Sequence, residues 1–342
     1  MKQILYIGNQ LEPRGGTPTS IDVLGPLLRE EGFDVKTASA NPGKLQRLKE
    51  MLYLVIRNRK TADFVLIDTY STQNFWYAVT VGMLCRQFRL KYIPILHGGE
   101  LPKRLDRSGR TAKQFFQQAF LNIAPSQYIM AEFESRGIRN LEYIPNSISV
   151  SDYHFKERKK LQPRLLWIRS FAEVYNPLLA LHVLEILLLK FPRAELCMLG
   201  PDKDGSMQGC KDLAENKKLP VRFMGKVSKK FLVQIAAEYD IFLNTTNADN
   251  TPVSVIEAMA LGLPVVSTDV GGMPFLIQHK ENGLLVSPRD AVKMAQAVEQ
   301  MLEAPIEAQQ MAFNARKKVE AFDWELVKEE WKAVLSSTGV ML

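Results

Sequence analysis

Short apolar runs alternate with helix-length segments along the whole chain. Such a run, rich in Val, Ile, Leu and Tyr, is typical of a strand that is buried on both faces of a parallel sheet. The segments between the runs are long enough for the helices that connect parallel strands. The pattern predicts strands at residues 3–7, 35–38, 64–68, 92–96, 122–124 and 142–144 in the first half, and at residues 164–168, 195–199, 221–224, 241–244, 264–267 and 284–286 in the second.

A polar, lysine-rich stretch separates the two series of strands. Residues 151–163 include HFKERKKLQP, have no apolar period and read as a linker. Because the strand pattern then restarts, we predict an α/β protein with two doubly wound, Rossmann-like domains, 1–155 and 156–322, and a ligand site in a central cleft. Residues 324–335 have no sheet position left, so a C-terminal helix within 323–342 is expected to pack back on the N-terminal domain.

Charge is distributed unevenly over the 342 residues. The net charge is +7, yet residues 1–160 hold 24 Lys and Arg against 15 Asp and Glu, a net of +9, and the remainder carries −2. The excess, concentrated at 57–60, 103–104 and 107–113, is compatible with an anionic membrane surface, an anionic acceptor or a merely solvated surface. Nucleic acid is disfavoured because the basic residues are scattered among acids without an aromatic stacking pattern.

The sequence shows neither a signal peptide nor a stretch that could span a membrane. The first lysine leads straight into an apolar run that reads as a strand, which leaves no room for a signal peptide. The longest apolar stretch, residues 178–189, contains His182 and Glu185 and is shorter than the roughly 20 residues of a spanning helix. The three cysteines form no metal-binding or C-x-x-C spacing, so we expect a reduced, cytoplasmic chain.

The most informative segment is residues 239–272, YDIFLNTTNADNTPVSVIEAMALGLPVVSTDVGG. A strand opens into a polar loop, and a helix follows for which Thr251 suits the N-cap and Pro252 the first helical position. The next amides, of Val253, Ser254 and Val255, then lack an acceptor within the helix. Free N–H groups and the helix dipole together favour a pyrophosphate at this point.

Two acids bracket this anion site. Asp249 precedes the helix and Glu257 lies inside it, a spacing that suits one acid for a sugar and the other for a ribose. Glu257 shares a helix face with the free amides and is surrounded by apolar residues, so its carboxylate is expected to be partly buried and to have partners. Each acid taken alone would be read as a solvated surface charge.

The segment from Asp249 to Gly272 resembles the signature of the family 4 retaining glycosyltransferases of the GT-B fold, the glycosyl transferases group 1. Weaker similarities follow in family order at Gly15-Gly16, 124–126, 144–147, 199–200, 223–225 and 282–286. The resemblance implies a metal-independent enzyme without a cofactor, which uses a nucleotide diphosphate sugar of the UDP or GDP type. It also implies catalytic roles for Arg169, Asp249 and His97, and donor-binding roles for Gly15, Gly16, Gly200, Gly225, Asn250, Thr251, Pro252, Val253, Ser254 and Glu257.

The chain departs from the family pattern at three places. The first acid is Asp249 where the family usually has Glu, and Met273-Pro274-Phe275 follows the glycine pair where an acid is common. A lysine that normally follows Arg169 is absent around Val174, and Asn176-Pro177 reads as a helix cap instead. Arg169, at a strand end where ligands bind in such sheets, would therefore carry most of the positive charge at the phosphates.

These motifs favour a retaining hexosyltransferase that acts on a glycan or lipid-linked acceptor in cell-surface polysaccharide or glycoconjugate biosynthesis, in the cytoplasm at the inner face of the cell membrane. Two alternatives stay open. A non-catalytic GT-B binding protein would fit the three departures. An NAD-dependent dehydrogenase would share the fold class, although neither first strand is followed by G-x-G-x-x-G.

Overall fold

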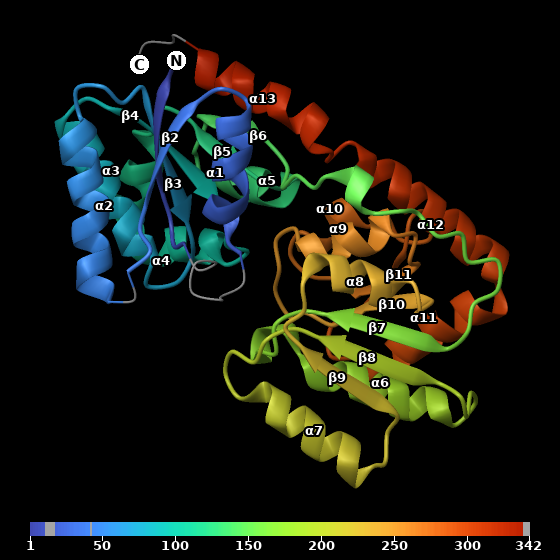
Figure 1. Ribbon diagram of the computed structural model, residues 1–342. Coiled ribbons are helices and arrows are strands. Elements are labelled where there is room, and N and C mark those ends of the chain that lie inside the picture. The colour runs from blue at the N-terminus through green and yellow to red at the C-terminus, as the bar shows by residue number, and fades with distance from the viewer. Residues whose placement is uncertain (11–17, 42, 338–342) are drawn as a thin grey trace. The chain divides into compact units, whose positions relative to one another are not determined.

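A computed structural model describes residues 1–10, 18–41 and 43–337 of the chain. The chain forms two compact units, Met1–Pro145 with Val327–Leu342, and Asn146–Leu326. Each unit contains a six-stranded, fully parallel sheet with helices packed against it (Figure 1). This confirms the predicted α/β class with two doubly wound parallel sheets.

The N-terminal unit has the strand order β2-β1-β3-β4-β5-β6. Its elements are β1 (Gln3–Ile7), α1 (Ser20–Glu30), β2 (Asp34–Ala38), α2 (Lys44–Asn58), β3 (Phe64–Thr69), α3 (Phe75–Gln87), β4 (Lys91–Leu96), α4 (Leu101–Gln117), β5 (Asn122–Ala124), α5 (Gln127–Ser135) and β6 (Leu141–Tyr143). Alternate strand residues such as Leu5 and Val65 join a core with α2 and α3. Tyr6 faces the other way, toward α1 at Gly25.

The C-terminal helix α13 (Trp324–Ser336) contributes to the N-terminal unit. Lys2 donates a hydrogen bond from Nζ to the Leu335 carbonyl at 2.8 Å, and Lys332 forms an ion pair with Glu31 at 2.6 Å. Trp331 and Leu335 are buried. The helix is therefore held by polar contacts with Lys2, just before β1, and Glu31, just after α1, and by the burial of two apolar side chains.

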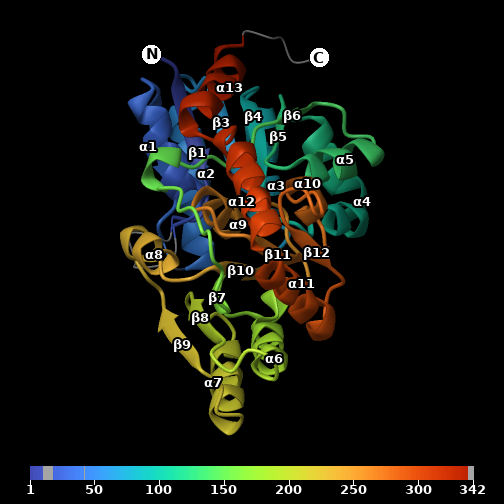
Figure 2. The same cartoon turned by 90° about the vertical axis from the view of Figure 1, so that its right-hand side faces the viewer.

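The C-terminal unit has the strand order β12-β11-β10-β7-β8-β9 (Figures 1 and 2). Its elements are β7 (Arg164–Ile168), α6 (Pro177–Leu188), β8 (Glu195–Leu199), α7 (Ser206–Asn216), β9 (Val221–Gly225), α8 (Lys229–Ala236), β10 (Ile241–Asn244), α9 (Val253–Ala260), β11 (Val265–Thr268), α10 (Met273–Leu276), β12 (Leu284–Val286), α11 (Ala291–Glu303) and α12 (Pro305–Glu320).

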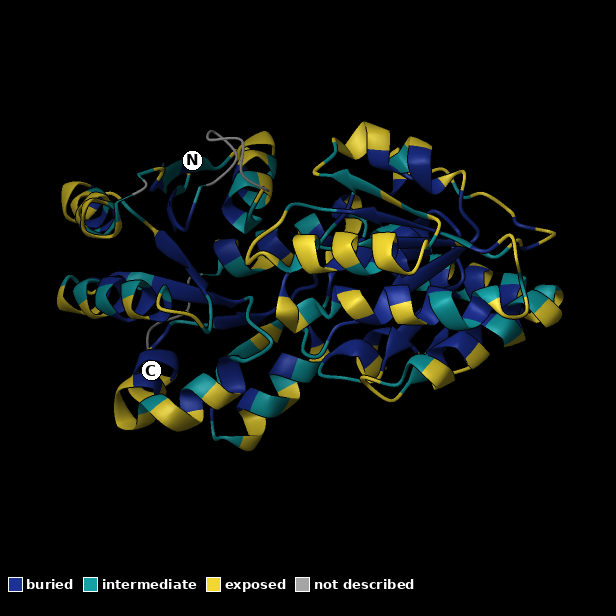
Figure 3. Cartoon of the chain, turned by 90° about the horizontal axis from the view of Figure 1, so that it is seen from below, coloured by how far each residue is buried: buried dark blue, intermediate teal, exposed yellow. Residues whose placement is uncertain are grey.

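Two cores lie on opposite faces of this second sheet. Leu165 and Trp167 pack with α6, α7 and α11, whereas the intervening Leu166 packs with α8, α9 and α12. Figure 3 shows the buried strands between helices that expose one side each. The alternation explains why these strands are apolar at nearly every position.

All twelve predicted strands are confirmed, and no strand end differs from its predicted position by more than one residue. None of the helices in the described ranges is both long and apolar enough to span a bilayer. The three cysteines are buried and unpaired.

The predicted linker is wrong. The two units meet in sequence at Pro145 and Asn146, and residues 151–163 belong to the C-terminal unit. Tyr153 and Arg158 are only 1% and 4% exposed. The Arg158 guanidinium donates to the main-chain carbonyls of Lys156, Ala236, Tyr239, Leu261 and Gly262. Burial lowers the pKa of Arg158 to about 10. The polar, lysine-rich pattern predicts a linker, whereas one of its arginines satisfies carbonyl groups inside the unit.

Candidate functional site

The polar loop after β10 leads into the N-terminus of α9, which begins one residue later than predicted. Pro252 is the N-cap, with φ −70° and ψ 124°, so Thr251 is not the cap and Pro252 is not the first helical residue. The Val255 amide donates to the Pro252 carbonyl at 3.1 Å. Only the amides of Val253 and Ser254, not all three predicted amides, therefore lack an acceptor among the described residues.

Ser254 adds a hydroxyl to these two amides. Its Oγ is buried and has no hydrogen-bond partner among the described residues. Asn146 donates a hydrogen bond from Nδ2 to the Thr251 carbonyl at 3.3 Å and thereby anchors the turn before the helix. The turn presents several donors at the positive end of the helix dipole, an arrangement that favours an anion.

The glycine pair of the motif supports the loop from behind. The Gly272 amide donates to the Asp249 carbonyl at 3.1 Å. A Cβ on Gly271 would lie 2.1 Å from the Asp249 carbonyl oxygen, and one on Gly272 would lie 1.9 Å from that of Asn250. Only glycine permits this approach of two backbone segments, so the pair fixes the position of Asp249 and Asn250.

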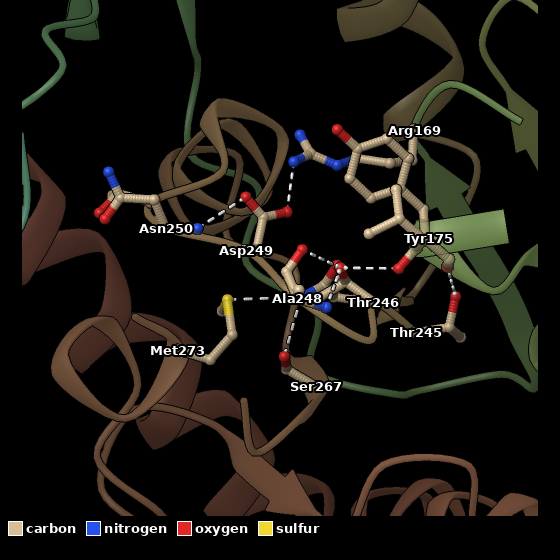
Figure 4. A network of polar contacts seen from close by, with 12 residues as sticks. Arg169, Tyr175, Thr245, Thr246, Ala248, Asp249, Asn250, Ser267 and Met273 are labelled. Carbon is tan, nitrogen blue, oxygen red and sulfur yellow. Dashed lines mark hydrogen bonds and ion pairs between the residues drawn. The ribbon is translucent and has the colours of Figure 1, made fainter. Parts of the chain in front are cut away.

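Arg169 and Asp249, which sequence analysis placed at different strand ends, form an ion pair through Arg169 Nη2 and Asp249 Oδ2 (Figure 4). The guanidinium also lies over the Tyr175 ring, 4.3 Å from its centroid. Arg169 Nε is buried without a hydrogen-bond partner among the described residues. The guanidinium is thus fixed in orientation while one of its donors remains unused.

Gly200 allows the main chain at Arg169 to approach β8. It has φ +143°, and a Cβ there would lie 1.8 Å from the Arg169 carbonyl oxygen. The Gly200 amide donates to the Gly225 carbonyl at 2.8 Å, and Gly225 has φ +63°. In this structure both glycines shape the backbone at the ends of β7, β8 and β9.

The segment around Val174, where the family usually has a lysine, is hydrogen-bonded to the loop after β10. The carbonyls of Val174 and Tyr175 accept hydrogen bonds from the Asn247 amide and the Thr245 hydroxyl, each at 2.8 Å. Asn176 is the N-cap of α6 and Pro177 its first residue, as the cap interpretation predicted. Asn176 caps with φ +46° and makes no side-chain hydrogen bond to the helix.

A second cation lies near Arg169 that sequence analysis missed. Lys203 follows β8, and its amide donates to the Phe171 carbonyl at 2.9 Å. Partial desolvation and the positive charge of Arg169 lower the pKa of Lys203. No motif signals this lysine, because it approaches Arg169 through the pairing of β7 with β8 and not through sequence.

Glu257 is partly buried and has a partner, as predicted, but the partner comes from the supposed linker. Tyr153 donates a hydrogen bond from its hydroxyl to Glu257 Oε1 at 2.6 Å. Burial raises the pKa of Glu257, while the Tyr153 hydrogen bond and the charge of Lys229 act in the opposite direction.

In the N-terminal unit, His97 follows β4 and is nearly buried. Its Nε2 lies 2.7 Å from Asp68 Oδ1, its Nδ1 lies 3.3 Å from the Ser20 hydroxyl, and its ring stacks on Tyr70 at 5.3 Å. Tyr6 donates to the same Asp68 oxygen at 3.0 Å. Asp68 Oδ2 is buried without a hydrogen-bond partner among the described residues. The predicted Gly15 and Gly16 lie outside the described residues.

No three His, Cys, Asp or Glu side chains come together as a possible metal site in the part of the chain that the structure describes. The groups that could face an anion at α9 are instead amides, hydroxyls and the Arg169 guanidinium.

Comparison with known proteins gives consistent matches. The family model described as Glycosyl transferases group 1 matches residues 149–318. The amylovoran biosynthesis glycosyltransferase AmsK of Erwinia amylovora is 25% identical over 294 residues, which cover 78% of this chain and 68% of that protein. The D-inositol 3-phosphate glycosyltransferase of Corynebacterium diphtheriae is 29% identical over 121 residues, 35% of this chain and 28% of that protein.

Solved structures resemble the chain over nearly its whole length. A sucrose-phosphate synthase from Thermosynechococcus elongatus matches with a TM-score of 0.80 at 20% identity, covering 98% of both chains. HepE of Anabaena, solved in complex with UDP-glucose, matches with a TM-score of 0.76 at 19% identity, covering 98% of this chain and 100% of that one. The fold is therefore GT-B.

Proposed function

This chain belongs to the glycosyl transferases group 1 family, and we propose that it is a retaining, metal-independent hexosyltransferase whose donor is a nucleotide diphosphate sugar. The acceptor is a glycan or a lipid-linked glycan. Similarity to a protein named for amylovoran biosynthesis supports a role in cell-surface polysaccharide or glycoconjugate biosynthesis. The complex of HepE with UDP-glucose supports a UDP-sugar, with a GDP-sugar as the other donor type.

The donor site of this proposal is the N-terminus of α9 together with Arg169. The observation that carries it is a set of unused donors: the Val253 and Ser254 amides, the buried Ser254 hydroxyl and the buried Arg169 Nε. A diphosphate supplies acceptors for all of them and competes with Asp249 for the guanidinium. Asp249, released from that ion pair, then accepts a hydrogen bond from a hydroxyl of the transferred sugar.

Positioning and charge stabilisation provide the catalysis in this mechanism. The bond between the sugar C1 and the diphosphate oxygen breaks while a bond from the acceptor oxygen to C1 forms on the same face. The acceptor proton passes to the departing diphosphate oxygen, so no protein nucleophile takes part. Arg169 and the α9 amides stabilise the charge that develops on the diphosphate, and Lys203 adds positive charge close to Arg169.

We place the acceptor in the N-terminal unit, with His97 as the group that contacts the transferred sugar. Asp68 holds one ring nitrogen of His97, and the longer contact with Ser20 leaves Nδ1 as the atom that a sugar hydroxyl can engage. We further propose that the enzyme works in the cytoplasm, at the inner face of the cell membrane.

Ligand-induced thermal stabilisation tests the proposed donor class. UDP or GDP is expected to raise the melting temperature, because saturation at a hundred times Kd stabilises the folded state by about 2.7 kcal/mol. NAD is expected to leave the melting temperature unchanged. A rise with NAD and none with any nucleoside diphosphate would favour the dehydrogenase alternative. Release of free nucleoside diphosphate from a donor sugar would argue against a non-catalytic binding protein.

The helix α2 offers a surface for the proposed membrane contact. Leu45, Tyr53 and Ile56 are 77%, 61% and 42% exposed and recur at helical spacing on one side of the helix. Lys49 lies on the same side of the helix, Lys60 follows two residues after its end, and both are exposed. Apolar residues flanked by lysines match the interface of an anionic bilayer, where each basic residue contributes about 1 kcal/mol.

Replacing Lys49, Arg57 and Lys60 together by glutamate is expected to abolish binding to anionic vesicles. The reversal turns attraction into repulsion at the membrane surface, and all three replaced side chains are exposed. The measurement is co-sedimentation with phosphatidylglycerol vesicles and with neutral phosphatidylcholine vesicles at low salt. A matched control carries glutamate at the exposed Lys211 and Lys230 of the C-terminal unit. A parent protein that stays in the supernatant with both vesicle types contradicts the membrane contact.

A further inference from the structure

Tyr153 is fixed in place beside the donor-site acid Glu257. Its hydroxyl donates to Glu257 Oε1 at 2.6 Å, a short bond of the charge-assisted kind, and its side chain is 1% exposed. Its carbonyl accepts a hydrogen bond from Arg316 Nη1 at 2.7 Å, and the same nitrogen donates to the Ala260 carbonyl at 2.7 Å. One arginine of α12 thus ties the backbone of Tyr153 to the end of α9.

Lys229 of α8 contributes a positive charge close to the Tyr153 ring. Its Nζ lies 4.8 Å from the centroid of the Tyr153 ring and 3.2 Å from Asp152 Oδ2. The ammonium group is therefore held over the ring by the residue that precedes Tyr153. Its charge favours the ionised form of Glu257, against the burial that disfavours it.

The hydrogen bond from Tyr153 engages only one of the two carboxylate oxygens. Glu257 Oε2 has no hydrogen-bond partner among the described residues. It is not among the fully buried polar atoms that lack a partner, so it is accessible to solvent. A carboxylate with one oxygen fixed and one open is suited to accept hydroxyl groups from a ligand. Without Tyr153, the flexible glutamate side chain would have to be ordered by the ligand itself.

We propose that Tyr153 is a positioning residue that turns Glu257 Oε2 toward the ribose hydroxyls of the donor and so makes the site selective for ribonucleotides. The proposal rests on the proposed donor site and on the expectation from the sequence that Glu257 faces the ribose. Tyr153 acts through Glu257 and does not itself touch the donor. The same tyrosine in a purely structural role would affect stability without affecting the choice between ribose and deoxyribose.

The test compares UDP with 2′,3′-dideoxy-UDP on the parent protein and on Tyr153→Phe. The parent is expected to bind UDP at least tenfold more tightly than the dideoxy compound by calorimetry. In Tyr153→Phe, affinity for UDP falls about tenfold while affinity for the dideoxy compound stays the same, so the preference disappears. Tyr239→Phe is the matched control: Tyr239 is equally buried in the same unit, and its hydroxyl accepts from Arg222 at 3.2 Å. This control is expected to keep the full preference.

The pH dependence gives a second readout with a definite sign. The Tyr153 hydrogen bond lowers the pKa of Glu257, so its loss raises that pKa further. UDP affinity, which requires the carboxylate, is then lost at a higher pH in Tyr153→Phe than in the parent as the pH falls. Lys229→Met, a change at a half-exposed side chain, is expected to shift the loss of UDP affinity at low pH in the same direction, because it removes the other group that lowers the pKa of Glu257.

The outcomes separate this inference from the donor-site proposal. A parent protein that binds neither UDP nor dideoxy-UDP contradicts the proposed donor site, whereas a parent that binds both equally well contradicts the ribose role of Glu257. The role of Tyr153 alone is overturned if the parent prefers UDP over dideoxy-UDP and Tyr153→Phe keeps the same preference and loses UDP affinity at the same pH.

Discussion

Replacing Arg169 by alanine is expected to lower kcat/KM for glycosyl transfer by about a hundred- to a thousandfold. Loss of one preorganised group that stabilises developing charge costs roughly 3 to 4 kcal/mol of transition-state stabilisation. The effect is large here because the Arg169 side chain is mostly buried, ordered by Tyr175 and Asp249, and has an unused donor. Steady-state transfer from a UDP- or GDP-sugar, followed as nucleoside diphosphate release, measures it.

Two further variants test whether the loss of activity in Arg169→Ala comes from the lost contact with the diphosphate. Arg169→Lys keeps the charge but loses the planar fork of donors, so it is expected to recover only part of the activity. Arg193→Ala removes an exposed arginine from the turn between α6 and β8 and is expected to leave transfer unchanged. Full activity in Arg169→Ala, with the fold intact by circular dichroism, would refute the assignment of Arg169 to the diphosphate.

The strands could be predicted because burial on both faces leaves a direct trace in the sequence. Leu165, Leu166 and Trp167 are all buried although they alternate between two cores, so the run is apolar at every position. The linker could not be predicted in the same way. Arg158 looks solvated in the sequence, but five main-chain carbonyls that the fold brings together receive its donors.

The start of α9 illustrates a limit of local signals. Threonine before proline is a strong pattern for a cap followed by a first helical residue. In the structure Pro252 is extended, with ψ 124°, and the helix begins at Val253. The Asn146 side chain holds the Thr251 carbonyl, and this contact comes from a segment more than a hundred residues away in sequence.

Proximity within the site was predictable only where sheet topology imposes it. Arg169 and Asp249 follow the neighbouring strands β7 and β10, and the carboxyl ends of parallel strands lie at one edge of a sheet. Tyr153 reaches Glu257 from the segment before the first strand of its unit, where no such rule applies. The pairing of Asp68 with His97 does follow topology, because β3 and β4 are neighbours and both residues lie toward the carboxyl ends of these strands.

Replacing Gly272 by alanine is expected to destabilise the C-terminal unit by at least about 3 kcal/mol, the upper range for overpacking a rigid site. Gly272 has φ −81° and ψ −4°, which alanine adopts without strain, so the cost is steric. The new Cβ would lie 1.9 Å from the Asn250 carbonyl oxygen, and a main-chain atom cannot turn aside as a side chain can. Urea denaturation followed by circular dichroism measures the change in the free energy of unfolding.

Gly209→Ala provides the matched control for this variant. Gly209 lies in α7, and a Cβ there meets no atom within 4 Å. Alanine is favoured over glycine in a helix interior by about 1 kcal/mol, so this variant is expected to be as stable as the parent or slightly more stable. Equal stability of Gly272→Ala and the parent would show that the loop can move away from the glycine pair. In that case the glycine pair would not be what holds Asp249 in position beside Arg169.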